Sequence, residues 1–283
     1  MEDIKQIGII GLGLIGGSLS LTLQAKGWKG KIVGFDASEE HCQQAISLGI
    51  VHEISAPQTW QNCDCIIVAI PIDAAEKIMP SILDSISAHQ VVMDMGSTKA
   101  SLCNTVKDHP KRSRFVASHP MWGTEYSGPS AASSRAFEGK SAVICDQEAS
   151  DADAVKLVED IYKALGMHIL YMRSDDHDVH AAYISHISHI TSFALANTVL
   201  EKEKEEDAIF ELASGGFEST VRLAKSNADM WVPILMQNRD NVLDVLNEHI
   251  SQLRKFKSCL EKENYEYLRE LIYQANSIKK IIH

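Results

Sequence analysis

The sequence predicts an α/β fold in the N-terminal part of the chain and an all-α fold in the C-terminal part. From Ile7 to about Met172, short apolar runs alternate with helix-length amphipathic segments, which is the pattern of a mostly parallel sheet with helical crossovers. After about Arg173 the strand-like runs stop and helical periodicity continues to the C-terminus. The chain of 283 residues is long enough for two domains. We therefore expect one domain over residues 1–172 and a second over residues 173–283.

Seven apolar runs in the first part are expected to be strands. Each of the first five ends in a polar or Gly/Pro-rich sequence, and the carboxyl ends of parallel strands meet at the sheet edge where ligands bind. In chain order the seven runs are IGIIG, KIVGFD, CIIVAIP, VVMDMGS, RFVASHP, SAVICD and MHILYM.

Four helices are expected in the second part, over residues 176–203, 206–226, 228–261 and 263–282. An apolar stripe at helical spacing is predicted to belong to a core or a dimer interface rather than to a ligand site. The stripe consists of Leu235, Val242, Val245, Leu246 and Leu253.

Composition and charge exclude several classes of function. Apolar residues make up 45% of the chain and charged residues 23%, as in ordinary globular proteins. The formal net charge of −11, without a basic cluster, argues against nucleic acid as a partner. The most apolar segment, residues 7–23, is short for a membrane span and carries five glycines. Six cysteines without CxxC spacing, and no secretory signal, predict a cytoplasmic protein with reduced thiols.

A GxGxxG motif follows the first expected strand and opens an apolar helix, which is the context that a dinucleotide-binding loop requires. Gly11 permits a tight turn, Gly13 lets the backbone approach a pyrophosphate, and Gly16 allows close packing of helix on strand. The helix N-terminus presents unpaired N–H groups to the phosphates. The alternative is a glycine-rich turn that serves packing alone. Such a turn would not need an acidic residue at the end of the next strand, where Asp36 lies.

Asp36 ends the second expected strand, twenty positions beyond Gly16. A carboxylate there accepts hydrogen bonds from the ribose hydroxyls of NAD and repels the additional phosphate of NADP. The first domain is therefore predicted to be a Rossmann-type dinucleotide-binding domain with NAD as cofactor. The predicted cofactor-binding residues are Gly11, Leu12, Gly13, Leu14, Ile15, Gly16 and Asp36.

Two polar residues follow later strands of the predicted sheet. Ser97, in DMGSTK, would lie at the ligand edge near a nicotinamide, or would equally serve as the N-cap of the next helix. His119 stands before Pro120, which favours an extended backbone that directs the imidazole past the sheet edge. A histidine there suits proton removal from an alcohol near neutral pH, and the alternative is a surface or capping histidine.

The helical part contributes His186 and His189, which share one helix face in SHISHIT. Together with His177 and His180 they would suggest a metal site, but no HExxH pattern or suitably spaced acidic ligand accompanies them. We expect no metal and a polar, ligand-facing stripe instead. Arg222 has the planar fork of donors that suits a carboxylate, and the alternative is an ordinary surface arginine.

These motifs together resemble the prephenate dehydrogenase family, which includes arogenate dehydrogenases. The resemblance runs nearly end to end and is carried by GLGLIGGS, DMGSTK, SHPMWGTEYSG, SHISHIT and GGFESTVRLAKSNADMW. It implies a nucleotide-binding domain followed by a helical domain that forms a homodimer. It also implies hydride transfer from the 4-hydroxyl carbon of a cyclohexadienyl ring to NAD or NADP, with loss of the ring carboxylate as carbon dioxide.

The resemblance also implies roles for individual residues. His119 corresponds to the histidine that takes the proton of the ring hydroxyl, Ser97 to the serine that orients it, and His189 to a second active-site histidine. Substrate-binding residues by the same resemblance are Arg222, for a carboxylate, Glu125, which guards the pocket, and the lining residues Thr124, Trp231 and His186. The small-molecule substrate is then prephenate, or arogenate as the alternative, in the route to tyrosine.

Two further alternatives are a dehydrogenase of the 3-hydroxyacid or 6-phosphogluconate type and a non-catalytic NAD-sensing protein. The first relies on a lysine in the helical part, for which Lys225 is a superficial candidate, but it lacks the His119, Thr124 and Glu125 loop. The second predicts that His119 is not needed as a base.

Overall fold

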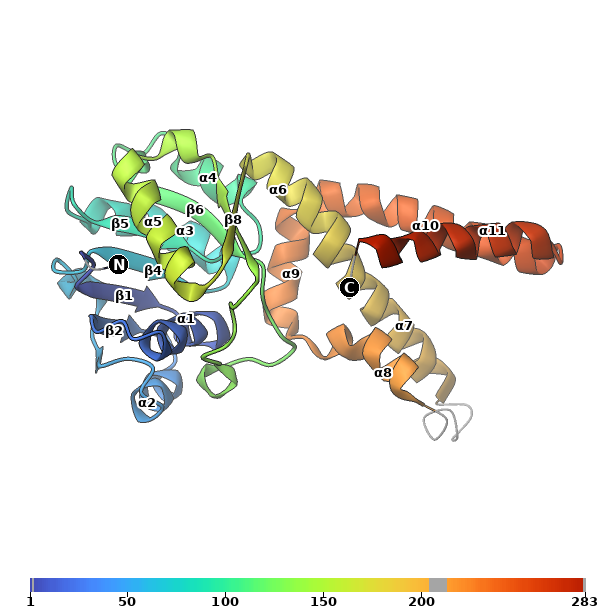
Figure 1. The fold of residues 1–283 in the computed structure, drawn as a ribbon, viewed down its shortest axis with the longest axis horizontal. Helices are drawn as coiled ribbons and strands as arrows, with labels where there is room; N and C mark the ends of the chain where they lie inside the picture. The colour runs from blue at the N-terminus through green and yellow to red at the C-terminus, as the bar shows by residue number, and fades with distance from the viewer. Residues whose placement is uncertain (2, 204–212, 282–283) are drawn as a thin grey trace. The chain divides into compact units, whose positions relative to one another are not determined.

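The computed structural model describes residue 1 and residues 3–203 and 213–281. By backbone contacts these residues form two compact units, residues 1–238 and residues 239–283. Figure 1 shows the sheet and its helices in the first unit.

One sheet runs through the first unit, and in the described residues it has the strand order β3-β2-β1-β4-β5-β6-β7-β8. All seven predicted strands are confirmed. The short β3 was not predicted, because two residues are too few to form an apolar run. The strands are β1 (Gln6–Ile10), β2 (Lys31–Phe35), β3 (Glu53–Ile54), β4 (Cys65–Val68), β5 (Val91–Asp94), β6 (Phe115–Pro120), β7 (Ser141–Cys145) and β8 (His168–Met172).

The sheet is parallel apart from one pair, because β7 runs antiparallel to β6. Pro120 pairs with Ala142 at the end of β6. The connection between these strands therefore leaves and returns at the same edge of the sheet, where β1, β4 and β5 also end. This geometry keeps the whole of SHPMWGTEYSG at the edge where ligands bind in parallel sheets.

Helices cover both faces of the sheet and bury its side chains in two layers. Along β4, Cys65 and Ile67 belong to one buried cluster and Ile66 and Val68 to the other, as the two-residue period of a strand requires. The helices are α1 (Leu14–Ala25), α2 (Glu39–Ser47), α3 (Ile72–Ser85), α4 (Ala100–Val106) and α5 (Ala152–Leu165). The central strands β4 and β5 are buried along their whole length, as expected where helices cover both faces of a sheet.

The helical region of the first unit begins at Ser174. Helix α6 (Ser174–Ala181) continues through a π-helical turn, Ala182–His186, into α7 (Ile187–Glu203), which confirms the expected helix over 176–203 with an irregular turn inside it. The beginning of the helix expected over 206–226 lies outside the described residues. Helix α8 (Gly215–Val221) and α9 (Ala228–Gln237) complete this region.

A single helix over 228–261 was wrong, because α9 ends at Gln237 and α10 (Arg239–Glu261) begins beyond Asn238. The Asn238 side chain donates to the carbonyl of Asp178 over 2.7 Å. This tertiary contact fixes Asn238 between two helices. The second unit contains α10 and α11 (Tyr265–Asn276), which contact each other. The turn between them includes Glu263, which has φ of 50°.

In the part of the chain that the structure describes, no helix combines the length and apolar character needed to cross a membrane.

Candidate active site

The glycine loop between β1 and α1 has three glycines in different surroundings. Gly11 has φ of +94°, and a Cβ added there would lie 2.3 Å from the carbonyl oxygen of Ala69. A Cβ on Gly16 would lie 2.0 Å from the carbonyl oxygen of Gly11. A Cβ on Gly13 would meet nothing within 4 Å. Gly11 and Gly16 are therefore required by the fold, whereas Gly13 borders open space at the N-terminus of α1.

Asp36 connects this loop to the end of β2. Its Oδ2 accepts a hydrogen bond from the Leu12 amide over 2.9 Å, and its Oδ1 accepts one from the Ser38 amide over 2.9 Å. The His41 ring lies 3.4 Å from Oδ1. The carboxylate is thus held beside the loop that Leu12, Leu14 and Ile15 help to form, and its lone pairs are not exhausted by these contacts.

A buried ion pair joins the ends of β5 and β6. Lys99 Nζ donates to the carboxylate of Asp94 and, over 2.8 Å, to the carbonyl of Ser118. Asp94 Oδ1 accepts from the Ser118 amide over 3.0 Å. Both charged side chains are essentially inaccessible to solvent, so each needs the other. Nothing in the sequence singled out this pair, although Asp94 and Lys99 are the first and last residues of DMGSTK.

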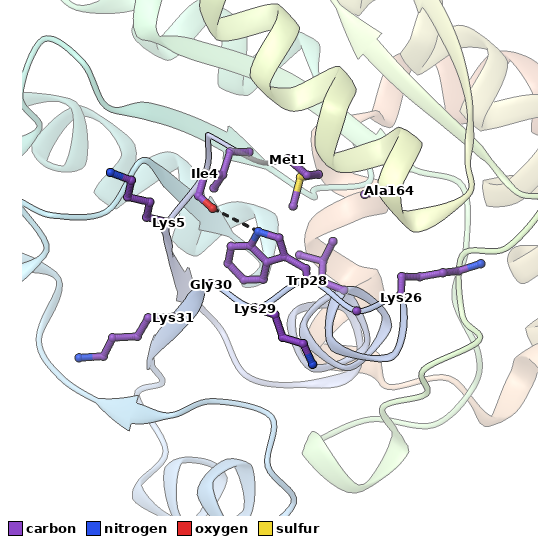
Figure 2. Close-up of a pocket in the computed structure, with 11 residues that line it drawn as sticks. Met1, Ile4, Lys5, Lys26, Trp28, Lys29, Gly30, Lys31 and Ala164 are labelled. Atoms are coloured by element: carbon purple, nitrogen blue, oxygen red, sulfur yellow. Dashed lines mark hydrogen bonds between the residues drawn. The ribbon is translucent and has the colours of Figure 1, made fainter.

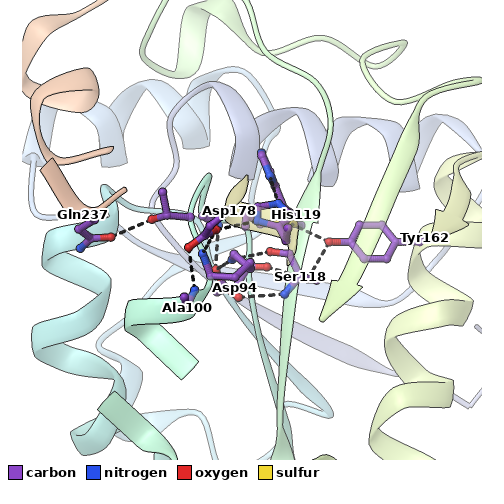
Figure 3. A network of polar contacts seen from close by, with 12 residues as sticks. Asp94, Ala100, Ser118, His119, Tyr162, Asp178 and Gln237 are labelled. Carbon is purple, nitrogen blue, oxygen red and sulfur yellow. Dashed lines mark hydrogen bonds and ion pairs between the residues drawn. The ribbon is translucent and has the colours of Figure 1, made fainter. Parts of the chain in front are cut away.

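Tyr162 of α5 holds the residue that precedes His119. Its hydroxyl donates to Ser118 Oγ over 2.8 Å, and Ser118 Oγ donates to the carbonyl of Asp94 over 2.7 Å. Burial raises the pKa of Tyr162, so the phenol stays protonated and acts as a donor. Figure 3 shows this network around the end of β6.

His119 is 9% exposed and lies at the end of β6. Burial lowers the pKa of its imidazole well below the ordinary 6.5, and His177, Lys99 and His186 lower it further. The ring is therefore neutral near neutral pH and carries a lone pair on one nitrogen. Its Nδ1 lies 2.9 Å from Nε2 of His177 on α6.

His177 was weighed in the sequence only as a metal candidate, but it contacts His119 and, through Nδ1, Oδ1 of Asp178 over 2.8 Å. His180 is exposed. Within residues 1, 3–203 and 213–281, no group of three or more His, Cys, Asp and Glu side chains is arranged to hold a metal ion.

Ser97 is half-buried in the turn after β5. Among the described residues no hydrogen bond joins it to His119, whose ring contact comes from His177 instead. The alternative role of Ser97 as a helix N-cap is wrong, because α4 begins at Ala100 with Lys99 in the capping position.

His186 and His189 both contact the ring of Trp231. The His189 ring stacks on the indole with a centroid distance of 3.4 Å, and the His186 ring meets it edge to face at 6.0 Å. Burial lowers the pKa of His186 to about 4 and also lowers that of His189. The His189 Nδ1 lies 3.0 Å from the carbonyl of Ser185 and donates to it, which leaves Nε2 as an acceptor.

Trp231 has a buried indole N–H with no hydrogen-bond partner in the described part of the chain. A buried donor without a partner costs free energy, so it is a candidate contact for a bound molecule.

Arg222 and Glu125 form an ion pair with 2.7 Å between Nη1 and Oε2. The side chain of Arg222 is 49% exposed and that of Glu125 12%. A hydrogen bond from its own backbone amide and the contact with Arg222 hold the pKa of Glu125 below its usual value. Thr124, next to Glu125, is half-buried and its hydroxyl accepts from the Tyr126 amide over 3.3 Å.

Trp122, which had no role in the sequence analysis, anchors the loop. Its ring packs edge to face on the buried Phe137 with a centroid distance of 5.4 Å. Farther along, the Ser133 amide donates to Ser18 Oγ of α1 over 2.9 Å. The loop after β6 is therefore attached to the same domain as the glycine loop.

A separate cavity of about 610 Å³ lies where β1 and β2 begin, at the opposite edge of the sheet (Figure 2). Trp28 lies in it and donates to the carbonyl of Ile4 over 3.2 Å. Four lysines surround it: Lys5, Lys26, Lys29 and Lys31. None of the predicted site residues lines this cavity.

Comparisons with known proteins agree with this architecture. The family model for the nucleotide-binding domain of prephenate dehydrogenase matches residues 19–171, and the model for its dimerization domain matches residues 173–274. The predicted fold class is therefore confirmed: a Rossmann-type nucleotide-binding domain followed by a helical dimerization domain.

Individual relatives cover nearly the whole chain. Prephenate dehydrogenase of Bacillus subtilis is 30% identical over 95% of this chain and 74% of its own length. Cyclohexadienyl dehydrogenase of Zymomonas mobilis is 27% identical over 95% of this chain and 93% of its own. The crystal structure of Aquifex aeolicus prephenate dehydrogenase with hydroxyphenyl propionate and NAD+ has a TM-score of 0.91 and 28% identity, with 99% of both chains covered.

Proposed function

Because this chain belongs to the prephenate dehydrogenase family of oxidoreductases, we propose that it oxidises prephenate with NAD and releases carbon dioxide and 4-hydroxyphenylpyruvate. The observation that carries the proposal is His119. This neutral, buried imidazole lies at the end of β6, at the sheet edge where the glycine loop also lies. Arogenate, converted directly to tyrosine, is the alternative substrate.

The glycine loop and Asp36 fit NAD. Gly13 leaves open space at the N-terminus of α1 for a pyrophosphate, and the Asp36 carboxylate stands at the end of β2 for the ribose hydroxyls. When bound, NAD supplies the hydride acceptor. NAD+ in the related Aquifex aeolicus enzyme supports the same choice here.

His119 acts as the general base in this proposal. It takes the proton of the ring hydroxyl, so the oxygen becomes electron-rich and the hydrogen on its carbon leaves as hydride. The bond to the ring carboxylate breaks, and its electron pair enters the ring, which becomes aromatic as carbon dioxide leaves. The chain then needs to supply positioning, a base and anion binding, with Ser97 and His189 beside the reacting ring.

Arg222 binds a substrate carboxylate in this proposal. In the structure its partner is Glu125, so an incoming carboxylate competes with Glu125 for the guanidinium. Glu125 thus makes entry selective for a group that binds arginine well, such as a carboxylate that accepts two parallel hydrogen bonds. Thr124, His186 and Trp231 line the remainder of the pocket.

We also propose that the substrate-binding and dimerisation domain begins at Arg173, directly after β8, and that the protein is a homodimer. The family-model boundary between residues 171 and 173 supports the first proposal. The match to a dimerization domain supports the second.

The decisive experiment is a two-by-two assay of prephenate and arogenate with NAD and NADP. We expect turnover with prephenate and NAD, and we expect Asp36→Ala to reduce the preference for NAD. Loss of turnover in His119→Ala with NAD binding retained would exclude a non-catalytic NAD-sensing protein. No oxidation of either substrate by the parent protein would refute the proposal.

A further inference from the structure

His119 is the end of a chain of three buried groups. Its Nδ1 lies 2.9 Å from His177 Nε2, and His177 Nδ1 lies 2.8 Å from Asp178 Oδ1. The residues are 9%, 2% and 4% exposed, respectively. The rings of His119 and His177 meet at an angle of 67° with their centroids 5.1 Å apart, so the contact is edge to face. Figure 3 shows His119 and Asp178 within one polar network.

The far end of the chain is fixed by the backbone. The amide of Lys99 donates to Asp178 Oδ1 over 2.8 Å, and the amide of Ala100 donates to Oδ2 over 2.9 Å. Asn238 donates to the Asp178 carbonyl over 2.7 Å. An ionised carboxylate can accept hydrogen bonds but cannot donate one. The hydrogen between Asp178 and His177 must therefore sit on His177 Nδ1.

That placement determines the tautomer of the next ring. A neutral His177 with hydrogen on Nδ1 has its lone pair on Nε2, so His119 Nδ1 must be the donor between the two rings. His119 then keeps its own lone pair on Nε2. Within the described ranges of the chain, no residue hydrogen-bonds His119 Nε2, so this nitrogen is free to receive a proton.

We propose that His177 and Asp178 are positioning residues that hold His119 in the tautomer with a free Nε2, ready to accept the proton of the substrate hydroxyl. The step breaks the substrate O–H bond and forms an N–H bond at His119 Nε2, while the hydrogen on Nδ1 stays in place. The resulting imidazolium donates to His177, which is itself polarised by the Asp178 carboxylate. The identity of the substrate hydroxyl rests on the proposed function, whereas the tautomer of His119 does not.

Two variants of His177 separate positioning from packing. His177→Gln places a carbonyl oxygen where Nε2 stood, and this oxygen accepts from His119 Nδ1–H. His177→Phe fills the space of the ring and accepts nothing. We expect kcat to fall roughly 100-fold in His177→Phe and to stay within about 10-fold of the parent in His177→Gln, with NAD affinity unchanged in both. A packing role predicts the reverse order, because phenylalanine keeps the apolar contact and glutamine does not.

Asp178→Ala should lower kcat in the parent but add little in the His177→Phe background, because both changes interrupt the same chain. His180→Phe, on the exposed side of α6, is the matched control and should leave kcat unchanged. Additive losses in Asp178→Ala and His177→Phe would overturn the proposal.

Nitrogen NMR of histidine-labelled protein reads the tautomer directly, with the His119 signals assigned by their loss in His119→Ala. We expect an unprotonated Nε2 and a protonated Nδ1 in the parent and in His177→Gln, and a mixture in His177→Phe. A protonated Nε2 in the parent refutes the proposal even if neither His177 variant folds. Because the spectrum needs no substrate, a parent protein without prephenate activity would refute the proposed function and leave this result standing.

Discussion

The imidazole of His119 is buried beside Lys99, His177 and His186, and burial is the largest cause that lowers its pKa. A base with a low pKa is available over a wider range of pH, because it loses its lone pair only when the solution becomes acidic enough to protonate it. Burial therefore makes His119 a weaker base but keeps its imidazole unprotonated over more of the pH range. Loss of charge on the substrate oxygen during hydride departure compensates for the weak base.

The pH dependence of kcat/KM tests this arrangement. Since the folded pKa of His119 lies below 6.5, we expect kcat/KM to be constant from pH 8 to about pH 6.5 and to fall only at lower pH. The titratable groups that act on the ring are His177, Lys99 and His186, and each of them lowers its pKa further. A fall that begins above pH 7 would contradict a buried neutral base.

Arg222 provides a second prediction at this scale. In Arg222→Ala the substrate carboxylate loses its charged donors, so we expect KM for prephenate to rise roughly 10- to 100-fold with a smaller change in kcat. The exposed Arg173, which pairs with Asp175, offers a matched control as Arg173→Ala. An unchanged KM in Arg222→Ala would remove the carboxylate-binding role.

At the scale of elements, the turn from β1 into α1 separates two kinds of glycine. Gly16 is required because a Cβ would meet the backbone of Gly11, whereas Gly13 has open space around it. The same residue type thus serves packing at one position and ligand access at another.

The matched pair Gly13→Ala and Gly16→Ala tests this difference. We expect Gly16→Ala to lose about 3 kcal/mol of folding free energy, because backbone atoms must move, and this loss is measurable by chemical denaturation. Gly13→Ala should unfold like the parent but bind NAD at least ~10-fold more weakly, since its methyl group enters the phosphate space. Equal NAD affinity in Gly13→Ala and the parent would refute the nucleotide role of the loop.

Local patterns in the sequence were enough for the elements that depend on near neighbours. The strand, the glycine loop and the helix all lie within Gln6–Ala25, and Asp36 follows Gly16 at the spacing typical of dinucleotide-binding domains. The structure of this unit therefore follows from residues close in sequence. The contact between His119 and His177 joins positions 58 apart, so no local sequence pattern predicts it. The break at Asn238 has the same cause, because its side chain is held by Asp178, 60 positions away. The burial of Lys99 also involves a residue farther along the chain, because its Nζ donates to the carbonyl of Ser118, 19 positions away, in addition to pairing with Asp94.

At the scale of the whole molecule, the second unit exposes many large apolar side chains on its two helices. They include Leu243, Leu253 and Leu260 on α10 and Tyr265, Tyr267, Ile272 and Tyr273 on α11. A surface of this kind is typical of a protein–protein interface. It agrees with the dimerization-domain match over residues 173–274.

Sedimentation equilibrium should therefore report about twice the chain mass of 31.3 kDa. Leu253, which is 55% exposed, gives the test variant: Leu253→Glu should raise the dimer dissociation constant, because a buried charge is costly. The neighbouring Gln252→Glu adds the same charge as a control. A parent protein that sediments as a monomer at micromolar concentration would exclude the homodimer.

The π-helical turn at Ala182–His186 sets the phase of the long α6–α7 rod. A π turn accommodates one extra residue in an otherwise regular helix, and one residue corresponds to about 100° of rotation. His177 lies before this turn and His189 after it, so their relative direction depends on that single insertion. Deleting one residue there would rotate His189, which stacks on Trp231, by about 100° relative to His177. The main effect of the irregular turn is therefore on the direction in which His189 leaves the helix axis, rather than on the length of the helix.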